Sequence, residues 1–335
     1  MQGNSGIHMA PESVGQRSFL AVGVGPGKVV LALLYAMVFT LAPSEGLKDR
    51  ANYLKYADSA SDFFGNYLER GIDYLLLNEP VWLLLNMALG GVFTPAMTVT
   101  LLSAVPAFIV ALFALSFARD YKSFFLVAVI LLSPQVIRSN VIQIRQGVAI
   151  AVFIAGAAIP SRPLRWLVWM VAPFIHSSFF LVLPVSAALE TMTIIGLSVR
   201  LRLAIIVLVI ALLCVAMVPV AELLGARQAV RVPRYGDEGI GLPSMLMWSG
   251  IFVLYAIQDR DFLQNNELGI SMIVFFVASY FSYDAIARIF QATALFSLLS
   301  SVDLRRMWWW IFTFPFVTYV VVQYAVRLNE PAFGW

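Results

Sequence analysis

The sequence predicts an all-α integral membrane protein, a polytopic helical bundle, from its composition and from the spacing of its apolar segments. Hydrophobic residues make up 61% of the 335 residues and charged residues only 12%. The mean hydropathy is +0.85. Soluble chains do not reach such values, because they need polar side chains to cover their surface. We therefore expect the bilayer to surround most of the chain.

Apolar segments recur along the chain and are separated by charged, Pro or Gly-bearing joints. They cover residues 28–43, 98–117, 123–137, 146–160, 164–176, 178–190, 201–220, 244–257, 268–283, 286–302 and 307–325. Several are shorter than the roughly 20 residues of a usual span. We expect about eleven transmembrane helices in one domain, 28–327, between a poorly ordered cytoplasmic tail, 1–27, and a short tail, 328–335.

The stretch from Val81 to Phe93 is apolar but short, and Pro80 precedes it. About 13 residues is the length of a re-entrant or interfacial segment rather than of a full span. We predict such a segment at the first outer loop, 44–79. The alternative, a span that reaches back to Ile72, stays open.

Lysine and arginine positions predict the orientation of the chain. With a cytoplasmic amino terminus, strict alternation puts one set of basic residues inside, as the positive-inside rule requires. The set is Arg119, Lys122, Arg162, Arg165, Arg200, Arg202, Arg260, Arg305 and Arg306. Treating 164–190 as one helix would move Arg200 and Arg202 outside, so we predict two helices that meet at a break near His176. The outer face then receives loops 44–79 and 221–243.

Arginines are also abundant on the predicted outer side, where cations are otherwise scarce. They are Arg138, Arg145, Arg227, Arg231, Arg234 and Arg288. A guanidinium is a permanently charged planar fork that grips phosphate oxygens in pairs, so the cluster indicates a phosphate or diphosphate ligand. The alternative is ion pairing with the acidic residues of the same loops.

Two of these arginines have informative local sequences. Arg145 and Gln146 open a predicted helix in IRQGVAIAVF, where free backbone N–H groups favour an anion and Gly147 allows close approach to the chain. Arg288 lies just inside an apolar run, where a charge indicates a cavity or a partner such as Asp284.

His176 lies between two apolar segments, in FIHSSFF, and is one of two histidines in the chain. Its ordinary pKa makes it a candidate proton acceptor for a sugar hydroxyl. The alternative is a structural histidine that hydrogen-bonds between helices, with Ser177 and Ser178 capping the helix that follows.

The loop 44–79 combines tyrosines with carboxylates, among them Tyr53, Tyr56, Asp58 and Glu79. Aromatic faces and carboxylates are groups that hold carbohydrate. The same mixture also describes an amphipathic interfacial helix. Tyr235, after Arg234, extends the carbohydrate-binding pattern to loop 221–243.

Several classes of chemistry have no motif here. The chain has no phosphate-binding loop for ATP, no His or Cys cluster for a metal, and no D-x-D pair beside a predicted outer span. We expect no cofactor and no metal. The net charge of +3 is ordinary for a membrane protein and does not indicate nucleic acid.

Short motifs follow one another in a distinctive order: NEP at 78–80, IRQGVA at 144–149, IHSS at 175–178, RY at 234–235 and AR at 287–288. In this order and spacing the chain resembles the EpsG family of Wzy-type polysaccharide polymerases. The resemblance spans residues 44–290.

The resemblance implies a bacterial cytoplasmic-membrane glycosyltransferase that joins undecaprenyl-diphosphate-linked oligosaccharide units on the outer face, with no nucleotide sugar. Arg145 and Arg288, with Arg234, would hold the leaving diphosphate. His176, Glu79 or Asp58 would accept the proton, beside Gln146 and Ser177. Tyr53, Tyr56 and Tyr235 would form a sugar platform.

Expected partners are the lipid-linked oligosaccharide, membrane lipid, a chain-length regulator and a flippase. Two other functions stay open: a transporter or flippase of lipid-linked oligosaccharide, and a ligase or acyltransferase that acts on surface glycan.

Overall fold

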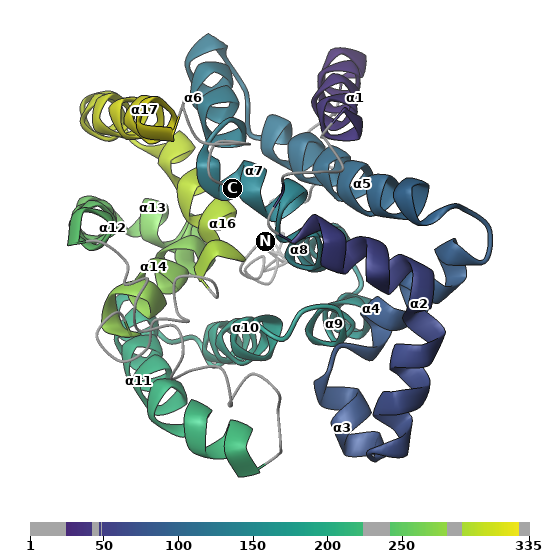
Figure 1. The fold of residues 1–335 in the computed structure, drawn as a ribbon. Helices are drawn as coiled ribbons and strands as arrows, with labels where there is room; N and C mark the ends of the chain where they lie inside the picture. Colours follow the sequence, from purple (N-terminus) through teal and green to yellow (C-terminus); the bar gives the residue numbers. More distant parts are fainter. Residues whose placement is uncertain (1–24, 42–46, 48, 224–241, 280–289, 328–335) are drawn as a thin grey trace, which may run out of the picture.

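A computed structural model describes residues 25–41, 47, 49–223, 242–279 and 290–327, and this part of the chain is helical with no strand (Figure 1). Among the described residues, two helices are long and apolar enough to cross a membrane, α5 (Pro95–Ser116) and α17 (Arg306–Arg327). A third candidate is the pair α6 (Tyr121–Leu131) and α7 (Pro134–Val141), bent by 51°. The all-helical class is confirmed, with two or three candidate spans by length and composition among the described residues. The expected count of eleven spans is not confirmed.

The other helices are mostly shorter and follow the predicted apolar segments. They are α1 (Pro26–Thr40), α2 (Arg50–Glu69), α3 (Ile72–Leu77), α4 (Pro80–Gly90), α8 (Ile144–Ala157), α9 (Arg162–Trp169), α10 (Phe179–Ile194), α11 (Val199–Leu223), α12 (Leu242–Ala256), α13 (Arg260–Asn265), α14 (Glu267–Ser279) and α16 (Ala294–Leu299), with 3-10 turns η1 (Ala172–Phe174) and η3 (Ser300–Asp303).

The run 164–190 is broken, as predicted. Helix α9 ends at Trp169, η1 follows, and α10 begins at Phe179, so His176 lies in the turn between them. Pro173 sits in the first turn of η1, where its missing N–H would have no partner within the helix in any case. The break therefore brings a polar turn, rather than a helix interior, to the centre of this run.

The segment expected as a long outer loop, 44–79, is helical over most of its length. In α2 the residues Tyr53, Ala57, Ala60 and Tyr67 are buried at helical spacing. This apolar stripe packs on α4, where Gly90 lies so close to the carbonyl of Ala57 that a Cβ would stand 2.7 Å from its oxygen. Helices α2, α3 and α4 form a lobe on one side of the bundle, which we call the α2–α4 lobe (Figure 1).

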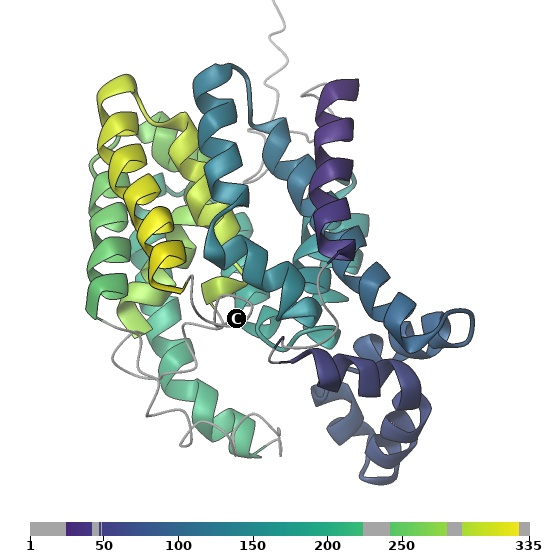
Figure 2. The ribbon, with the colours of Figure 1, turned by 45° about the horizontal axis from the view of Figure 1, so that its top comes forward.

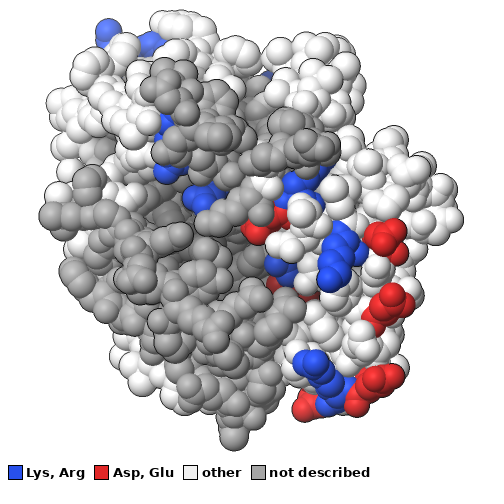
Figure 3. All heavy atoms as spheres, in the orientation of Figure 1, with Lys and Arg blue, Asp and Glu red and all other residues white. Residues whose placement is uncertain are grey.

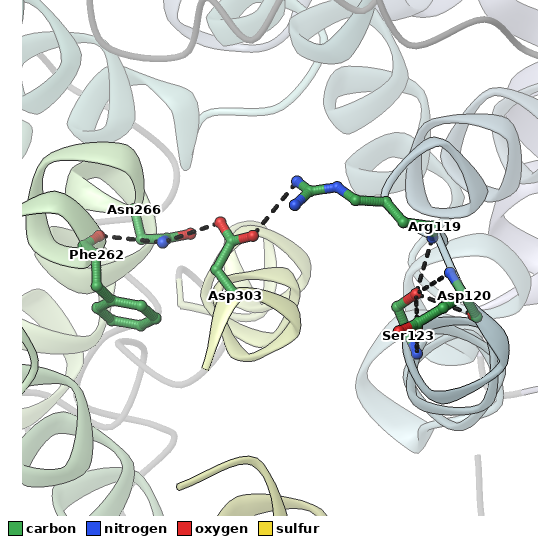
Figure 4. Close-up of polar contacts among 6 residues, drawn as sticks. All are labelled: Arg119, Asp120, Ser123, Phe262, Asn266 and Asp303. Carbon is green, nitrogen blue, oxygen red and sulfur yellow. Dashed lines mark hydrogen bonds and ion pairs between the residues drawn. The ribbon is translucent and has the colours of Figure 1, made fainter. Parts of the chain in front are cut away.

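Ion pairs connect the ends of many helices on one side of the molecule. Arg119 pairs with Asp303 at 3.4 Å, and Asp303 also accepts a hydrogen bond from Asn266 at 3.3 Å (Figure 4). Arg305 pairs with Asp259. Charged side chains therefore connect three parts of this side: the α5–α6 joint, the turn η3 and the joint between α13 and α14.

Buried carboxylates continue this set of contacts along neighbouring helices. Glu267 pairs with Arg202 at 2.7 Å, and both side chains are almost fully buried. Glu190 forms ion pairs with Arg162 at 2.7 Å and with Arg165 at 3.0 Å. We call the group Arg119, Arg162, Arg165, Glu190, Arg202, Asp259, Glu267, Asp303 and Arg305 the ion-pair belt. In Figure 2 the α5–α6 joint lies at the upper end, and α2 and α3 lie at the lower end.

We expect Glu267→Gln to destabilise the fold by about 3 kcal/mol or more, because it leaves the buried Arg202 without its counter-charge. Asp259→Asn is the matched control: its pair with Arg305 is exposed and is worth less than about 1 kcal/mol. Thermal unfolding in detergent measures both. Equal losses of Tm in the two variants would show that burial does not set the strength of these pairs.

Gly147 allows a close approach between α7 and α8. A Cβ there would lie 2.5 Å from the carbonyl oxygen of Ser139 and 3.2 Å from the Asn140 side-chain oxygen. We expect Gly147→Ala to cost about 1–3 kcal/mol by overpacking. Gly65→Ala in α2 meets nothing within 4 Å and should stabilise by about 0.5–1 kcal/mol. A Gly147→Ala protein with an unchanged Tm contradicts the close contact between α7 and α8.

Candidate functional site

The site is built around an ion pair between Glu79 and Arg145, which are distant in the sequence. Glu79 caps α4 in the left-handed backbone region, with φ 63° and ψ 53°, and is 5% exposed. Non-glycine residues adopt this conformation at a cost, and such positions concentrate at functional sites. Its carboxylate pairs with Arg145 at the start of α8 and accepts the backbone N–H of Ser177 at 3.3 Å. One carboxylate therefore joins α4, α8 and the His176 turn.

Aromatic rings of the α2–α4 lobe surround the Arg145 guanidinium. It lies 6.0 Å from the Tyr53 ring centroid and 5.7 Å from that of Tyr56. Trp82 meets both tyrosines edge-on, at 5.7 and 6.4 Å between centroids. Tyr53 is buried, so its ring faces are occupied by these neighbours, whereas Tyr56 is partly exposed. The two rings hold Arg145 by cation–π attraction.

His176 lies beside this pair, and its hydrogen bonds define its neutral form. Nδ1 accepts the backbone N–H of Ser178 at 3.2 Å and lies 2.9 Å from the Ser178 hydroxyl. A backbone amide can only donate, so Nδ1 is unprotonated and the neutral ring carries its proton on Nε2. In this tautomer His176 can donate a hydrogen bond from Nε2 and cannot accept a proton there.

Burial lowers the pKa of His176 to about 4 from its ordinary 6.5, and the nearby Glu79 charge opposes this while Arg145 adds to it. The ring is therefore neutral at physiological pH. Between pH 4 and 6.5 the folded state holds fewer protons than the unfolded state. Protonation of His176 in the unfolded state consequently lowers the free energy of unfolding as the pH falls from 6.5 to 4.

Ser178 does not cap α10 as one interpretation of the sequence expected. Its backbone is helical and its side chain makes no cap hydrogen bond. The hydroxyl is used by His176 Nδ1 instead. A serine can serve only one of these partners well, and the turn geometry favours the imidazole.

Other residues singled out from the sequence lie apart from this cluster or outside the described residues. Gln146 is fully buried in α8. Asp58 is exposed on α2 and accepts from Ser59 at 3.2 Å, and within the described residues no ion pair links it to Arg145. Arg234, Tyr235 and Arg288 lie outside the described residues. The structure therefore brings together Tyr53, Tyr56, Glu79, Arg145, His176 and Ser177.

Trp82 belongs to the cluster but was not singled out from the sequence. It is 1% exposed, and its indole nitrogen has no hydrogen-bond partner. Trp82 lies two residues after Pro80 and faces the tyrosines of α2. Pairing the apolar face of α2 with that of α4 would have identified it from the sequence.

Acidic and basic side chains of the lobe gather over α2 and α3 on the face drawn in Figure 3.

Comparison with known proteins gives no match: no protein-family model, no curated protein and no solved structure is similar to this chain.

Nitrogen-15 correlation spectra of imidazole-labelled protein test the assignment of His176. His8→Gln leaves a single histidine in the chain. We expect a proton on Nε2 at pH 7 and a titration midpoint near pH 4. A proton on Nδ1, or a midpoint near the ordinary value of 6.5, contradicts the hydrogen bond from Ser178 and the burial of the ring.

Proposed function

We propose that this protein polymerises undecaprenyl-diphosphate-linked oligosaccharide units into a surface or exopolysaccharide. The observation that carries the proposal is the cluster of Arg145, Glu79 and His176 at one aromatic-lined site. Arg145 is a permanent cation that can bind a diphosphate, and Glu79 is a carboxylate that can accept a proton. His176 is a neutral hydrogen-bond donor. The motifs that resemble the EpsG family contribute these same three residues.

We further propose that the protein lies in a bacterial cytoplasmic membrane with this site at the outer face. Helices that follow the eleven predicted apolar segments support eleven crossings, if α6 with α7 and α9 with η1 each count as one. The ion-pair belt would then lie at the cytoplasmic end, as the positive-inside rule favours. Short helices are compatible with this arrangement where neighbours bury their ends.

In the proposed reaction the hydroxyl oxygen of one lipid-linked unit bonds to the anomeric carbon of the growing glycan. The bond from that carbon to the diphosphate oxygen breaks, and the carrier diphosphate leaves. Glu79 accepts the hydroxyl proton, because it is the one carboxylate in the cluster and His176 Nδ1 already accepts a backbone N–H.

Arg145 would stabilise the negative charge that grows on the leaving diphosphate. Cation–π contacts with Tyr53 and Tyr56 and the ion pair to Glu79 hold its guanidinium in place before substrate arrives. His176 would donate its Nε2 proton in a hydrogen bond to a substrate oxygen. These roles need no nucleotide and no metal, since the lipid-linked donor is already activated.

Turnover of purified protein with undecaprenyl-diphosphate oligosaccharide, run with chelator on a glycan ladder gel, tests the proposal. We expect a ladder from wild type and at least about a hundredfold less product from Arg145→Ala. Arg70→Ala is the control: Arg70 is exposed in the same lobe, and its hydrogen bond and cation–π contact among the described residues are with Tyr74. No ladder, with movement of the lipid-linked oligosaccharide across liposomes, would sink the polymerase and favour a transporter.

A further inference from the structure

A small polar cavity lies between four helices of the bundle, α5, α7, α8 and α16. Its walls include Val110 of α5, Ile150 of α8 and Leu295 of α16, and α7 contributes the side chains of Gln135 and Asn140. The space inside is about 10 Å³, which is the least that one water molecule needs. Among the described residues that line it there is none of the six from the candidate site. The cavity is therefore a separate feature, beyond the proposed function.

Helix α7 is the second half of the bent pair α6–α7, and side chains supply hydrogen bonds to the backbone at the bend. The carbonyls of three consecutive residues, 130–132, each accept a hydroxyl: from Ser133 at 2.6 Å, from Tyr35 at 2.9 Å and from Tyr324 at 2.7 Å. A bend in an apolar bundle frees backbone carbonyls, and neighbouring side chains or ordered water must satisfy them. At the bend itself, the protein provides these partners from its own side chains.

Asn140, in the last turn of α7, has a side-chain oxygen without such a partner. The residue is 1% exposed, and its Nδ2 donates to the carbonyl of Val136 at 3.0 Å. Because a carbonyl only accepts, this bond fixes the orientation of the amide. Oδ1 is buried with no hydrogen-bond partner among the described residues. A Cβ on Gly147 would lie 3.2 Å from Oδ1, so this oxygen faces α8 one turn before Ile150, which lines the cavity.

Gln135, in the first turn of α7, leaves a second buried oxygen unpaired. Its Nε2 donates to the Tyr319 hydroxyl at 2.7 Å, whereas its Oε1 has no partner in the described part of the chain. Ser139 and Gln291 also line the cavity and add a hydroxyl and a second amide. Buried polar atoms are nearly always paired, and a buried water makes about two to four hydrogen bonds to groups that otherwise lack partners. The cavity therefore offers the room and the partners that one water needs.

We propose that this cavity binds one water molecule, which donates hydrogen bonds to Oδ1 of Asn140 and Oε1 of Gln135. The water completes the polar contacts of α7, as hydroxyl groups do at the bend. Water also suits the opposite orientation of the Gln135 amide, because it both donates and accepts, whereas a sodium ion suits only oxygen atoms. The site does not rest on the proposed function, since no residue of the proposed reaction lines the cavity.

X-ray hydroxyl-radical footprinting of the detergent-purified full chain tests the site, because radicals that form from a bound water label the side chains beside it. We expect Leu295 and Ile150 to be labelled several-fold faster than Leu298 and Ile154. These controls lie one turn further along the same helices and are also buried, but they do not line the cavity. Equal rates within both pairs overturn the proposal.

Asn140→Leu removes one acceptor and places an apolar group at the cavity. We expect labelling of Leu295 to fall to the rate of Leu298, because the water loses a partner. If this variant does not fold, Val110→Ile makes the same test with one added methylene in the cavity wall, and Val99→Ile, buried in α5 away from the cavity, is its control. Leu295 labelling that stays at the wild-type rate in the folded variant overturns the proposal.

Thermal unfolding in sodium chloride and in choline chloride of equal ionic strength separates water from a cation. We expect the same Tm in both salts, because water needs no ion. A Tm that is higher in sodium chloride, with the difference lost in Asn140→Leu, would assign the cavity to sodium and overturn the water site.

Discussion

The ion pair between Glu79 and Arg145 is the interaction on which the candidate site depends. It joins the α2–α4 lobe to α8, and the same carboxylate reaches the His176 turn through the N–H of Ser177. The pair is mostly buried, so either group alone would leave an uncompensated charge beside aromatic rings. The left-handed backbone of Glu79 shows that the chain accepts local strain to aim this carboxylate.

The two ends of the molecule handle charge in different ways. Each of the five arginines in the ion-pair belt contacts a carboxylate, so charge there is balanced within the protein. In the cluster of the lobe, Arg145 pairs with Glu79 and lies against the rings of Tyr53 and Tyr56. A guanidinium held by one carboxylate and two aromatic rings can bind an external anion in place of that carboxylate. This arrangement is the physical basis for placing ligand binding at the lobe.

Periodicity and charge in the sequence predict most of the helices, the break at His176 and a helix start next to Arg145, because these depend on neighbours along the chain. The contacts that define the site cannot be predicted in this way, because they join residues far apart in the sequence. Glu79 and Arg145 are 66 residues apart, and no local pattern predicts their pairing. The helical α2 was expected as a loop because its charges hide a buried stripe, which also contains Arg50. The tautomer of His176 depends on a turn whose geometry the sequence FIHSSFF does not specify.

Pyrophosphate affinity of Glu79→Gln, compared with that of wild type, tests most directly whether the Glu79–Arg145 pair forms an anion site. The carboxylate competes with an anion for the guanidinium, so removing its charge should leave binding intact and make it several-fold tighter. Wild-type protein that binds no pyrophosphate, or a Glu79→Gln variant that folds and binds it more weakly than wild type, would contradict this account.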